Sequence, residues 1–119
     1  RIVVVMTATR PRVLLVDEDP VSRLAIDRQL DTIGWEAYCA GSGFDALRTI
    51  GLRLPFEALL VSVRLPDMFG QTVAAAAAQI IPSAQLIFLV TEPPVVTLGA
   101  PFLVKPFSTS ALAAALQPR

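Results

Sequence analysis

A regular alternation between short apolar runs and longer segments of helical periodicity constrains the fold of this chain most strongly. Five runs have the length of a strand: RVLLVD (12–17), WEAYCA (35–40), ALLVS (58–62), QLIFLV (85–90) and PFLV (101–104). Several are apolar on both faces, as in strands that are covered from both sides. Strands that alternate with helices over short connections form parallel βαβ units. The sequence therefore predicts an α/β fold, a doubly wound five-stranded parallel sheet with helices on both faces.

The helices between these strands carry recognisable start and stop signals. Asp19 is a favourable N-cap and Pro20 suits the first helical position, so a helix is expected to begin there and to stop at Gly34. Further helices are expected over 43–50, over 71–80, where Pro82 ends the helix, and from the cap Ser108 to Leu116. The five alanines at 74–78 are expected to form a smooth face that packs closely on the sheet.

Composition and charge exclude several classes of function. The chain has 119 residues, of which 54% are hydrophobic, which is enough for one packed core. Ten basic and ten acidic residues cancel, so we expect no nucleic-acid binding by this domain. There is no histidine, which excludes histidine-based catalysis and histidine-ligated metal. No apolar run reaches the roughly 18 residues of a membrane span. We expect no membrane insertion and a soluble, cytoplasmic bacterial domain.

Two further expectations concern the ends of the domain and its cysteine. Residues 1–11 are interpreted as an extension or linker and residues 12–117 as the domain; Ile2 to Val5 could add an edge strand or contact a partner, an alternative that stays open. Two interpretations of the first residues stay open: the chain is a piece of a larger protein, or Met6 is its true start. Cys39 is alone in an apolar stretch and is expected to be a small, reduced core residue.

Polar residues cluster where the predicted strands end. In a parallel sheet of this kind, ligands bind and reactive side chains lie at the carboxyl ends of the strands. An acidic triplet (Asp17, Glu18 and Asp19) follows the first strand, and Ser62 ends the third. Thr91 follows the fourth strand and Lys105 the fifth. Each residue alone is a weak signal, since an acidic turn often only caps a helix, but together they predict one polar pocket.

These residues give the chain a resemblance to the receiver domain of bacterial response regulators in two-component phosphorelay signalling. The matching segments are VLLVDEDP, AGSGFDAL, RLPDMFG, VTE and GAPFLVKPF, from about residue 12 to residue 116. The segment DPVSRLAIDRQLDTIGWE resembles receivers attached to hybrid histidine kinases most. The resemblance implies a flavodoxin-like fold. It also implies a phosphate-accepting aspartate at the end of the third strand, Mg²⁺ held by oxygen ligands, and a lysine that pairs with the phosphoryl group.

The residues of this chain match that pattern except at the acceptor and, to a smaller extent, at Glu18. The resemblance implies that Asp17 and Glu18 correspond to the metal-binding acids, Arg64 to the residue whose carbonyl completes the metal site, and Thr91 and Lys105 to the switch pair. Ser62 stands at the acceptor position. A serine hydroxyl is a weak nucleophile without a neighbouring base, so we expect no phosphorylation there and a hydrogen-bonded, structural serine instead.

The serine at the acceptor position should also weaken metal binding and change which acidic residue pairs with Lys105. Ser62 removes one anionic oxygen from the Mg²⁺ shell, and Glu18 is longer than the aspartate usual in the family. We therefore expect no cofactor and weak or lost Mg²⁺ binding, with a vestigial metal site. Without an acceptor carboxylate, Lys105 is free to pair with Asp17 or Glu18 and hold the pocket closed.

A third departure lies between the fourth and fifth strands, where the family has a full helix. Pro93 and Pro94 stand together and are followed closely by Gly99, so the helix is expected to be missing or reduced to a turn. The apolar residues of this segment, Val95, Val96 and Leu98, should then lie near a shallow face that suggests a partner.

The function that these features favour is a degenerate, non-enzymatic receiver that acts as a protein-interaction or regulatory module. Its partner would be a histidine kinase or an attached signalling domain, and a homodimer is an option. One alternative is a small-ligand sensor, for example of a cyclic dinucleotide, using Arg53, Arg64 and the proline segment. Another is a working phosphate acceptor that uses Asp67, although Asp67 fits a turn residue better. A flavodoxin-like FMN carrier, suggested only by GSG at 41–43, fits least.

Overall fold

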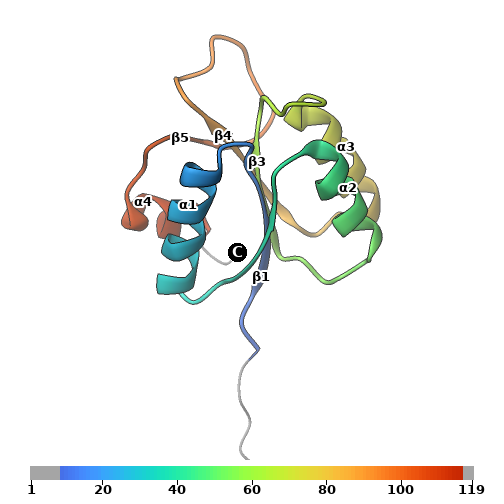
Figure 1. Cartoon of the computed structure of the whole chain (residues 1–119), viewed down its shortest axis with the longest axis horizontal. Helices are drawn as coiled ribbons and strands as arrows, with labels where there is room; N and C mark the ends of the chain where they lie inside the picture. Colours follow the sequence, from blue (N-terminus) through green and yellow to red (C-terminus); the bar gives the residue numbers. More distant parts are fainter. Residues whose placement is uncertain (1–8, 117–119) are drawn as a thin grey trace, which may run out of the picture.

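The computed structural model describes residues 9–116 and shows the predicted α/β architecture (Figure 1). The strands are β1 (Arg12–Val16), β2 (Glu36–Ala40), β3 (Ala58–Ser62), β4 (Gln85–Val90) and β5 (Phe102–Val104). The helices are α1 (Pro20–Thr32), α2 (Gly43–Gly51), α3 (Gly70–Ile80) and α4 (Thr109–Ala115). All these elements lie within two residues of the expected boundaries.

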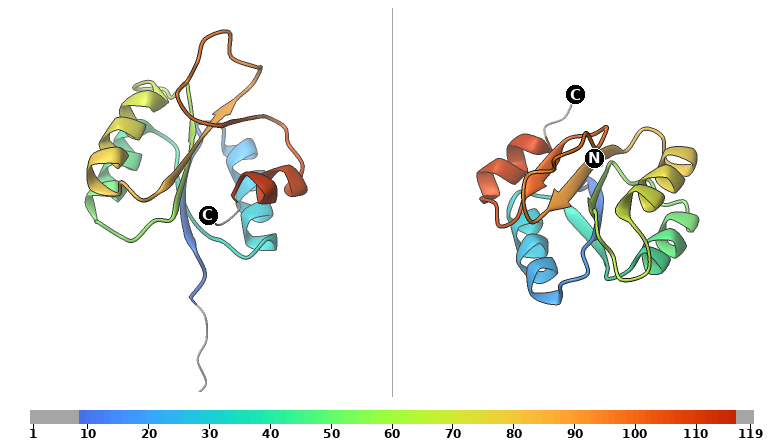
Figure 2. Two further views of the ribbon diagram at one scale, coloured as in Figure 1. Left: turned by 180° about the vertical axis from the view of Figure 1, so that it is seen from behind. Right: turned by 90° about the horizontal axis from the view of Figure 1, so that it is seen from above.

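The five strands form one parallel sheet in the order β2-β1-β3-β4-β5. Helices α1 and α4 cover one face and α2 and α3 the other, as the view from above shows (Figure 2). Side chains of each central strand alternate between the two faces. In β1, for example, Leu14 and Val16 pack with α2 and α3, whereas Val13 and Leu15 pack with α1 and α4. This two-sided burial explains the nearly continuous apolar strands of the sequence.

The helix termini follow the predicted capping signals. The Asp19 carboxylate accepts a hydrogen bond from the Val21 amide at 3.0 Å, and Pro20 occupies the first turn of α1. Ser108 accepts from the Ala111 amide at 3.0 Å and caps α4. Gly34, after α1, has φ 91°, a left-handed conformation that glycine adopts without strain. These caps place the acidic triplet and Lys105 at fixed positions beside the strand ends.

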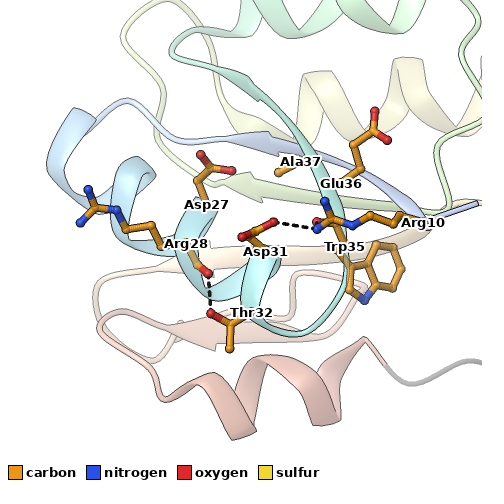
Figure 3. Close-up of a pocket in the computed structure, with 8 residues that line it drawn as sticks. All are labelled: Arg10, Asp27, Arg28, Asp31, Thr32, Trp35, Glu36 and Ala37. Atoms are coloured by element: carbon orange, nitrogen blue, oxygen red, sulfur yellow. Dashed lines mark hydrogen bonds and ion pairs between the residues drawn. The ribbon is translucent and has the colours of Figure 1, made fainter.

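The segment before β1 is held against the turn between α1 and β2 (Figure 3). Arg10 donates to the Asp31 carboxylate at 2.9 Å, to the Gly34 carbonyl at 3.3 Å and to the Trp35 carbonyl. Arg10 and Pro11 of the expected extension therefore contact the domain, Pro11 through its carbonyl, which accepts the Glu36 amide at 2.8 Å. The apolar run Ile2 to Val5 lies outside the described residues, so its role stays a prediction.

The connection between β4 and β5 contains no helix, which confirms the expected departure. Residues 91–101 form a loop that projects from the carboxyl edge of the sheet (Figure 1, orange). Val95 is 100% exposed and Val96 is 68% exposed. β5 is an edge strand, and Phe102 pairs with Phe88 of β4, whose side chain packs on the α2–α3 face. Phe102 is 42% exposed, because no helix covers this part of the face.

The position of Cys39 differs from its prediction. Cys39 was expected in the core, but it is exposed. The reason is that β2 lies at the edge of the sheet, where α1 covers the strand incompletely. Partial burial and the nearby Asp27 carboxylate still raise the pKa of the Cys39 thiol.

No helix within residues 9–116 combines the length and the apolar character needed to cross a membrane.

Candidate functional site

An open cleft at the carboxyl edge of the sheet contains most of the predicted site residues. It has a volume of about 440 Å³ and lies between the ends of β3 and β4 and the loop at 91–101. Its lining includes Glu18, Ser62, Arg64, Thr91 and Lys105. The structure therefore brings these five residues together as expected. Asp19 does not line this cleft, and its carboxylate caps α1 instead.

Backbone hydrogen bonds that continue the sheet hold the strand ends in register. The Asp17 amide donates to the Ala40 carbonyl at 3.0 Å, and the Val63 amide donates to the Leu89 carbonyl at 3.1 Å. The Lys105 amide donates to the Val90 carbonyl at 2.8 Å. Because these bonds fix the backbone on both sides of the cleft, the side chains of the site start from well-defined positions.

Asp17 is fully buried and both of its carboxylate oxygens are engaged. Oδ1 lies 3.1 Å from Lys105 Nζ and accepts the Asp19 amide, also at 3.1 Å. Oδ2 accepts the hydroxyl of Ser22 at 2.5 Å. The Lys105 side chain is only 12% exposed. Such a pair is little screened by solvent, so the predicted Asp17–Lys105 contact is confirmed as a buried ion pair with supporting hydrogen bonds.

Ser62 departs from the sequence-based expectation. It is 3% exposed at the end of β3, and its hydroxyl has no hydrogen-bond partner among the described residues. The expected hydrogen bond of Ser62 is therefore not found among these residues. Lys105, which lines the same cleft, pairs with Asp17 instead. Ser62 thus presents an unsatisfied polar group to the cleft.

A tight turn joins β3 to α3 and shapes the cleft beside Ser62. The Gly70 amide donates to the Val63 carbonyl at 2.7 Å, and a Cβ added to Gly70 would lie 2.1 Å from the Ser62 carbonyl oxygen. Only glycine permits this approach, so the amino end of α3 lies against the end of β3. Phe69, the N-cap of α3, provides no side-chain cap.

Asp67, the alternative acceptor, has a structural role in this turn. Its two carboxylate oxygens accept the amides of Gly43 at 2.9 Å and Phe44 at 2.8 Å. These two bonds, with that of Phe44 the larger influence, hold the pKa of the Asp67 carboxyl below its usual value. Asp67 therefore ties the β3–α3 turn to the first turn of α2, which accords with its interpretation as a turn residue.

Sequence reasoning missed two contributors to the acidic end of the site. Ser22 supplies a hydroxyl to Asp17, and the Arg23 guanidinium donates to the Asp17 carbonyl at 2.7 Å. Both lie in the first turn of α1. A helix that begins at Pro20 directly after the acidic triplet turns residues of its first turn back toward that triplet, and this spacing was the available signal.

The residues suggested for a cyclic dinucleotide do not meet. Arg53 follows α2 and precedes β3, which places it at the amino edge of the sheet. Arg64 and the 91–101 loop lie at the carboxyl edge and line the cleft. The two ends of the sheet are separated by the length of a strand, so Arg53 and the proline segment do not share one ligand.

The oxygen ligands at this site are few. Glu18 is exposed, Asp17 is engaged by Lys105, Ser22 and the Asp19 amide, and position 62 offers a hydroxyl in place of a carboxylate. Within the part of the chain that the structure describes, no three acidic or cysteine side chains gather in a group suited to a metal ion.

Sequence comparison relates the chain to proteins of bacterial two-component signalling. No protein-family model matches it. It is 37% identical over 76 residues to the sensor protein TorS of Escherichia coli, an alignment that covers 64% of this chain and 8% of TorS. It is 38% identical over 66 residues to the transcriptional regulatory protein AruR of Pseudomonas aeruginosa, covering 52% of this chain and 27% of AruR. The chain thus spans about a quarter of these relatives' length or less.

Solved structures share the whole fold. The receiver domain of the sensor histidine kinase PA1611 from Pseudomonas aeruginosa, solved with magnesium in its active-site cleft, has a TM-score of 0.81 and 23% identity. This match covers 92% of the present chain and 96% of that domain. The chemotaxis protein CheY4 of Vibrio cholerae has a TM-score of 0.80 and 26% identity, covering 91% of this chain and 97% of CheY4.

Proposed function

Because this chain is a receiver domain of the two-component type, we propose that it is not phosphorylated at the usual position and acts as a protein-interaction or regulatory module. The observation that carries the proposal is the state of two residues at the centre of the site, Ser62 and Lys105. A serine hydroxyl stands at the acceptor position, and the lysine expected to meet the phosphoryl group is bound to Asp17 at 3.1 Å.

Among its described residues, this site lacks the nucleophile and the base that phosphoryl transfer to a side chain requires. A phosphate acceptor must be a competent nucleophile, and a serine needs an adjacent base for that. The Ser62 hydroxyl has no hydrogen-bond partner among the described residues, so no described base activates it. We propose no enzymatic activity for this domain.

Magnesium fits the remaining donors poorly. Mg²⁺ requires near-octahedral oxygen coordination and is usually bound through one or two carboxylates. Among the residues that the structure describes, Asp17 is the one buried carboxylate, and a metal would have to compete with Lys105 and the Ser22 hydroxyl for its oxygens. We therefore propose that Mg²⁺ binding is weak or lost, and that the Asp17–Lys105 pair takes the place of the metal in neutralising the buried acid.

A protein partner is favoured by the exposed apolar residues of the β4–β5 region. Val95, Val96 and Phe102 are exposed together around an edge strand, which is typical of surfaces that bind other proteins. The similarity to sensor kinases favours a histidine kinase or an attached signalling domain as that partner, in the cytoplasm, with a homodimer as a further option.

Beryllofluoride with Mg²⁺ tests the proposal at the level of the pocket, because this complex mimics a phosphoryl group on an aspartate. We expect the amide NMR signals of Ser62, Thr91 and Lys105 to remain in place when both reagents are added. A receiver that has the acceptor aspartate serves as the positive control. Saturable shifts at these three positions would show a working pocket and would contradict the proposal.

A further inference from the structure

We propose that the cleft beside Ser62 binds a small organic molecule that carries a carboxylate group and an apolar body. This inference goes beyond the module role and does not depend on it. It rests on the unpartnered buried hydroxyl, on the amino end of α3 and on the apolar wall that the 91–101 loop adds to the cleft.

The size and lining of the cleft fit a small molecule. Its volume of about 440 Å³ falls in the range of small-ligand sites, which combine apolar walls with a few convergent polar groups. One wall consists of residues from the end of β4 and from the loop. Its apolar members are Leu89, Val90, Pro93, Pro94, Val95, Val96 and Leu98.

The inner end of the cleft offers hydrogen-bond donors. Ser62 is 97% buried, lines the cleft and has no partner among the described residues, so a ligand oxygen would satisfy it. Lys105 has three N–H donors, of which the ion pair with Asp17 uses one. Gln71, in the first turn of α3, also lines the cleft. The amino end of a helix carries a partial positive charge and favours anions.

The charges around the cleft select a singly charged anion. Lys105 and Arg64 are the basic residues of the lining, and Glu18 and Glu92 are the acidic ones. Both glutamates are exposed, so solvent screens them, whereas the Lys105 side chain is 12% exposed. The residual repulsion from these two carboxylates acts on each negative charge of a ligand, so a doubly charged phosphate meets about twice as much of it as a singly charged carboxylate. A carboxylate carries one charge and suits this balance.

The loop residues explain why the ligand should be apolar beyond its carboxylate. Val95 and Val96 are exposed on the loop, and Leu98 is half-buried. An apolar group that covers these side chains removes hydrocarbon surface from water, which favours binding in proportion to the area covered.

Benzoate is a suitable probe, and benzamide is its neutral counterpart of nearly the same shape. We expect benzoate to shift the amide NMR signals of Ser62, Val63, Gln71 and Val96 saturably. A molecule of this size should bind with a dissociation constant on the order of 1 mM. Benzamide should bind clearly more weakly. An equal response to both probes, or no saturable shift with benzoate well above that concentration, would overturn the proposal.

Two substitutions locate the site. Ser62→Ala removes the hydroxyl without adding bulk and should weaken benzoate binding about tenfold, the effect expected for a lost hydrogen bond to a charged group. Val96→Asp places a charge on the apolar wall and should abolish binding. Leu52→Asp is its matched control, because Leu52 is 67% exposed, close to the 68% of Val96, and lies outside the cleft. Equal benzoate affinity in wild type, Ser62→Ala and Val96→Asp would refute this assignment.

Discussion

Replacing Lys105 with methionine should destabilise the domain strongly, because it leaves the Asp17 carboxylate buried without its counter-charge. Methionine keeps much of the apolar stem of lysine and removes only the ammonium group, so the change isolates the charge. The two charged atoms are 3.1 Å apart, Asp17 is 0% exposed and the Lys105 side chain is 12% exposed. Solvent therefore does little to compensate the remaining carboxylate.

The expected loss of unfolding free energy depends on the hydrogen bonds that Asp17 keeps when the ammonium group is removed. Removing one partner of a buried ion pair costs about 3–5 kcal/mol of unfolding free energy. Asp17 still accepts hydrogen bonds from Ser22 and from the Asp19 amide in the variant, so we expect the lower end, about 3 kcal/mol. The double variant Lys105→Met with Asp17→Asn removes both charges and should recover at least half of that loss.

Urea unfolding of the purified domain measures these differences, provided that the slopes of the transitions agree. Arg48→Met is the control, since Arg48 pairs with Asp45 at a similar distance of 3.2 Å but the two side chains are 71% and 48% exposed. Its loss should be roughly 0.5 kcal/mol or less. A Lys105→Met loss as small as that of the control, or a double variant as unstable as the sum of its single changes, would refute the buried ion pair.

Three further predictions concern the neighbouring residues. Ser62→Ala should raise the unfolding free energy in urea by about 1 kcal/mol, because it removes an unsatisfied buried hydroxyl; a loss of that size would show that the hydroxyl is hydrogen-bonded. Ser62→Asp should lower the melting temperature in chelator and recover it with Mg²⁺, more fully when combined with Glu18→Asp, whereas no loss and no recovery would mean that these acids do not share a pocket. Asp67→Asn should lower the unfolding free energy at neutral pH, because the amides of Phe44 and Gly43 lower the native pKa of Asp67. The difference in unfolding free energy from wild type should narrow as the pH falls through that lowered pKa, and a difference that is constant with pH would contradict this.

The layout of the sheet and the position of the site could be predicted from the sequence because they depend on local patterns. Parallel strands buried on both faces give nearly continuous apolar runs, and the topology brings their carboxyl ends to one edge. Pro93 and Pro94 likewise exclude a regular helix in the β4–β5 connection. These features place Ser62, Thr91 and Lys105 together with no knowledge of side-chain contacts.

The remaining features depend on distances that local patterns do not encode. Local patterns do not show that Lys105 pairs with Asp17 across the sheet, or that the Ser62 hydroxyl has no hydrogen-bond partner among the described residues. The exposure of Cys39 depends on how far α1 covers an edge strand. The position of Arg53 is different, because a residue between a helix and the following strand always lies at the amino edge of such a sheet. Its separation from the cleft could have been derived from the predicted topology alone.

The most direct test of the account is the intact mass of the protein after incubation with acetyl phosphate or phosphoramidate and Mg²⁺. With Ser62 at the acceptor position and Lys105 held by Asp17, we expect an unchanged mass. Addition of one phosphoryl group to most of the molecules, labile to hydroxylamine as an acyl phosphate is, would contradict it.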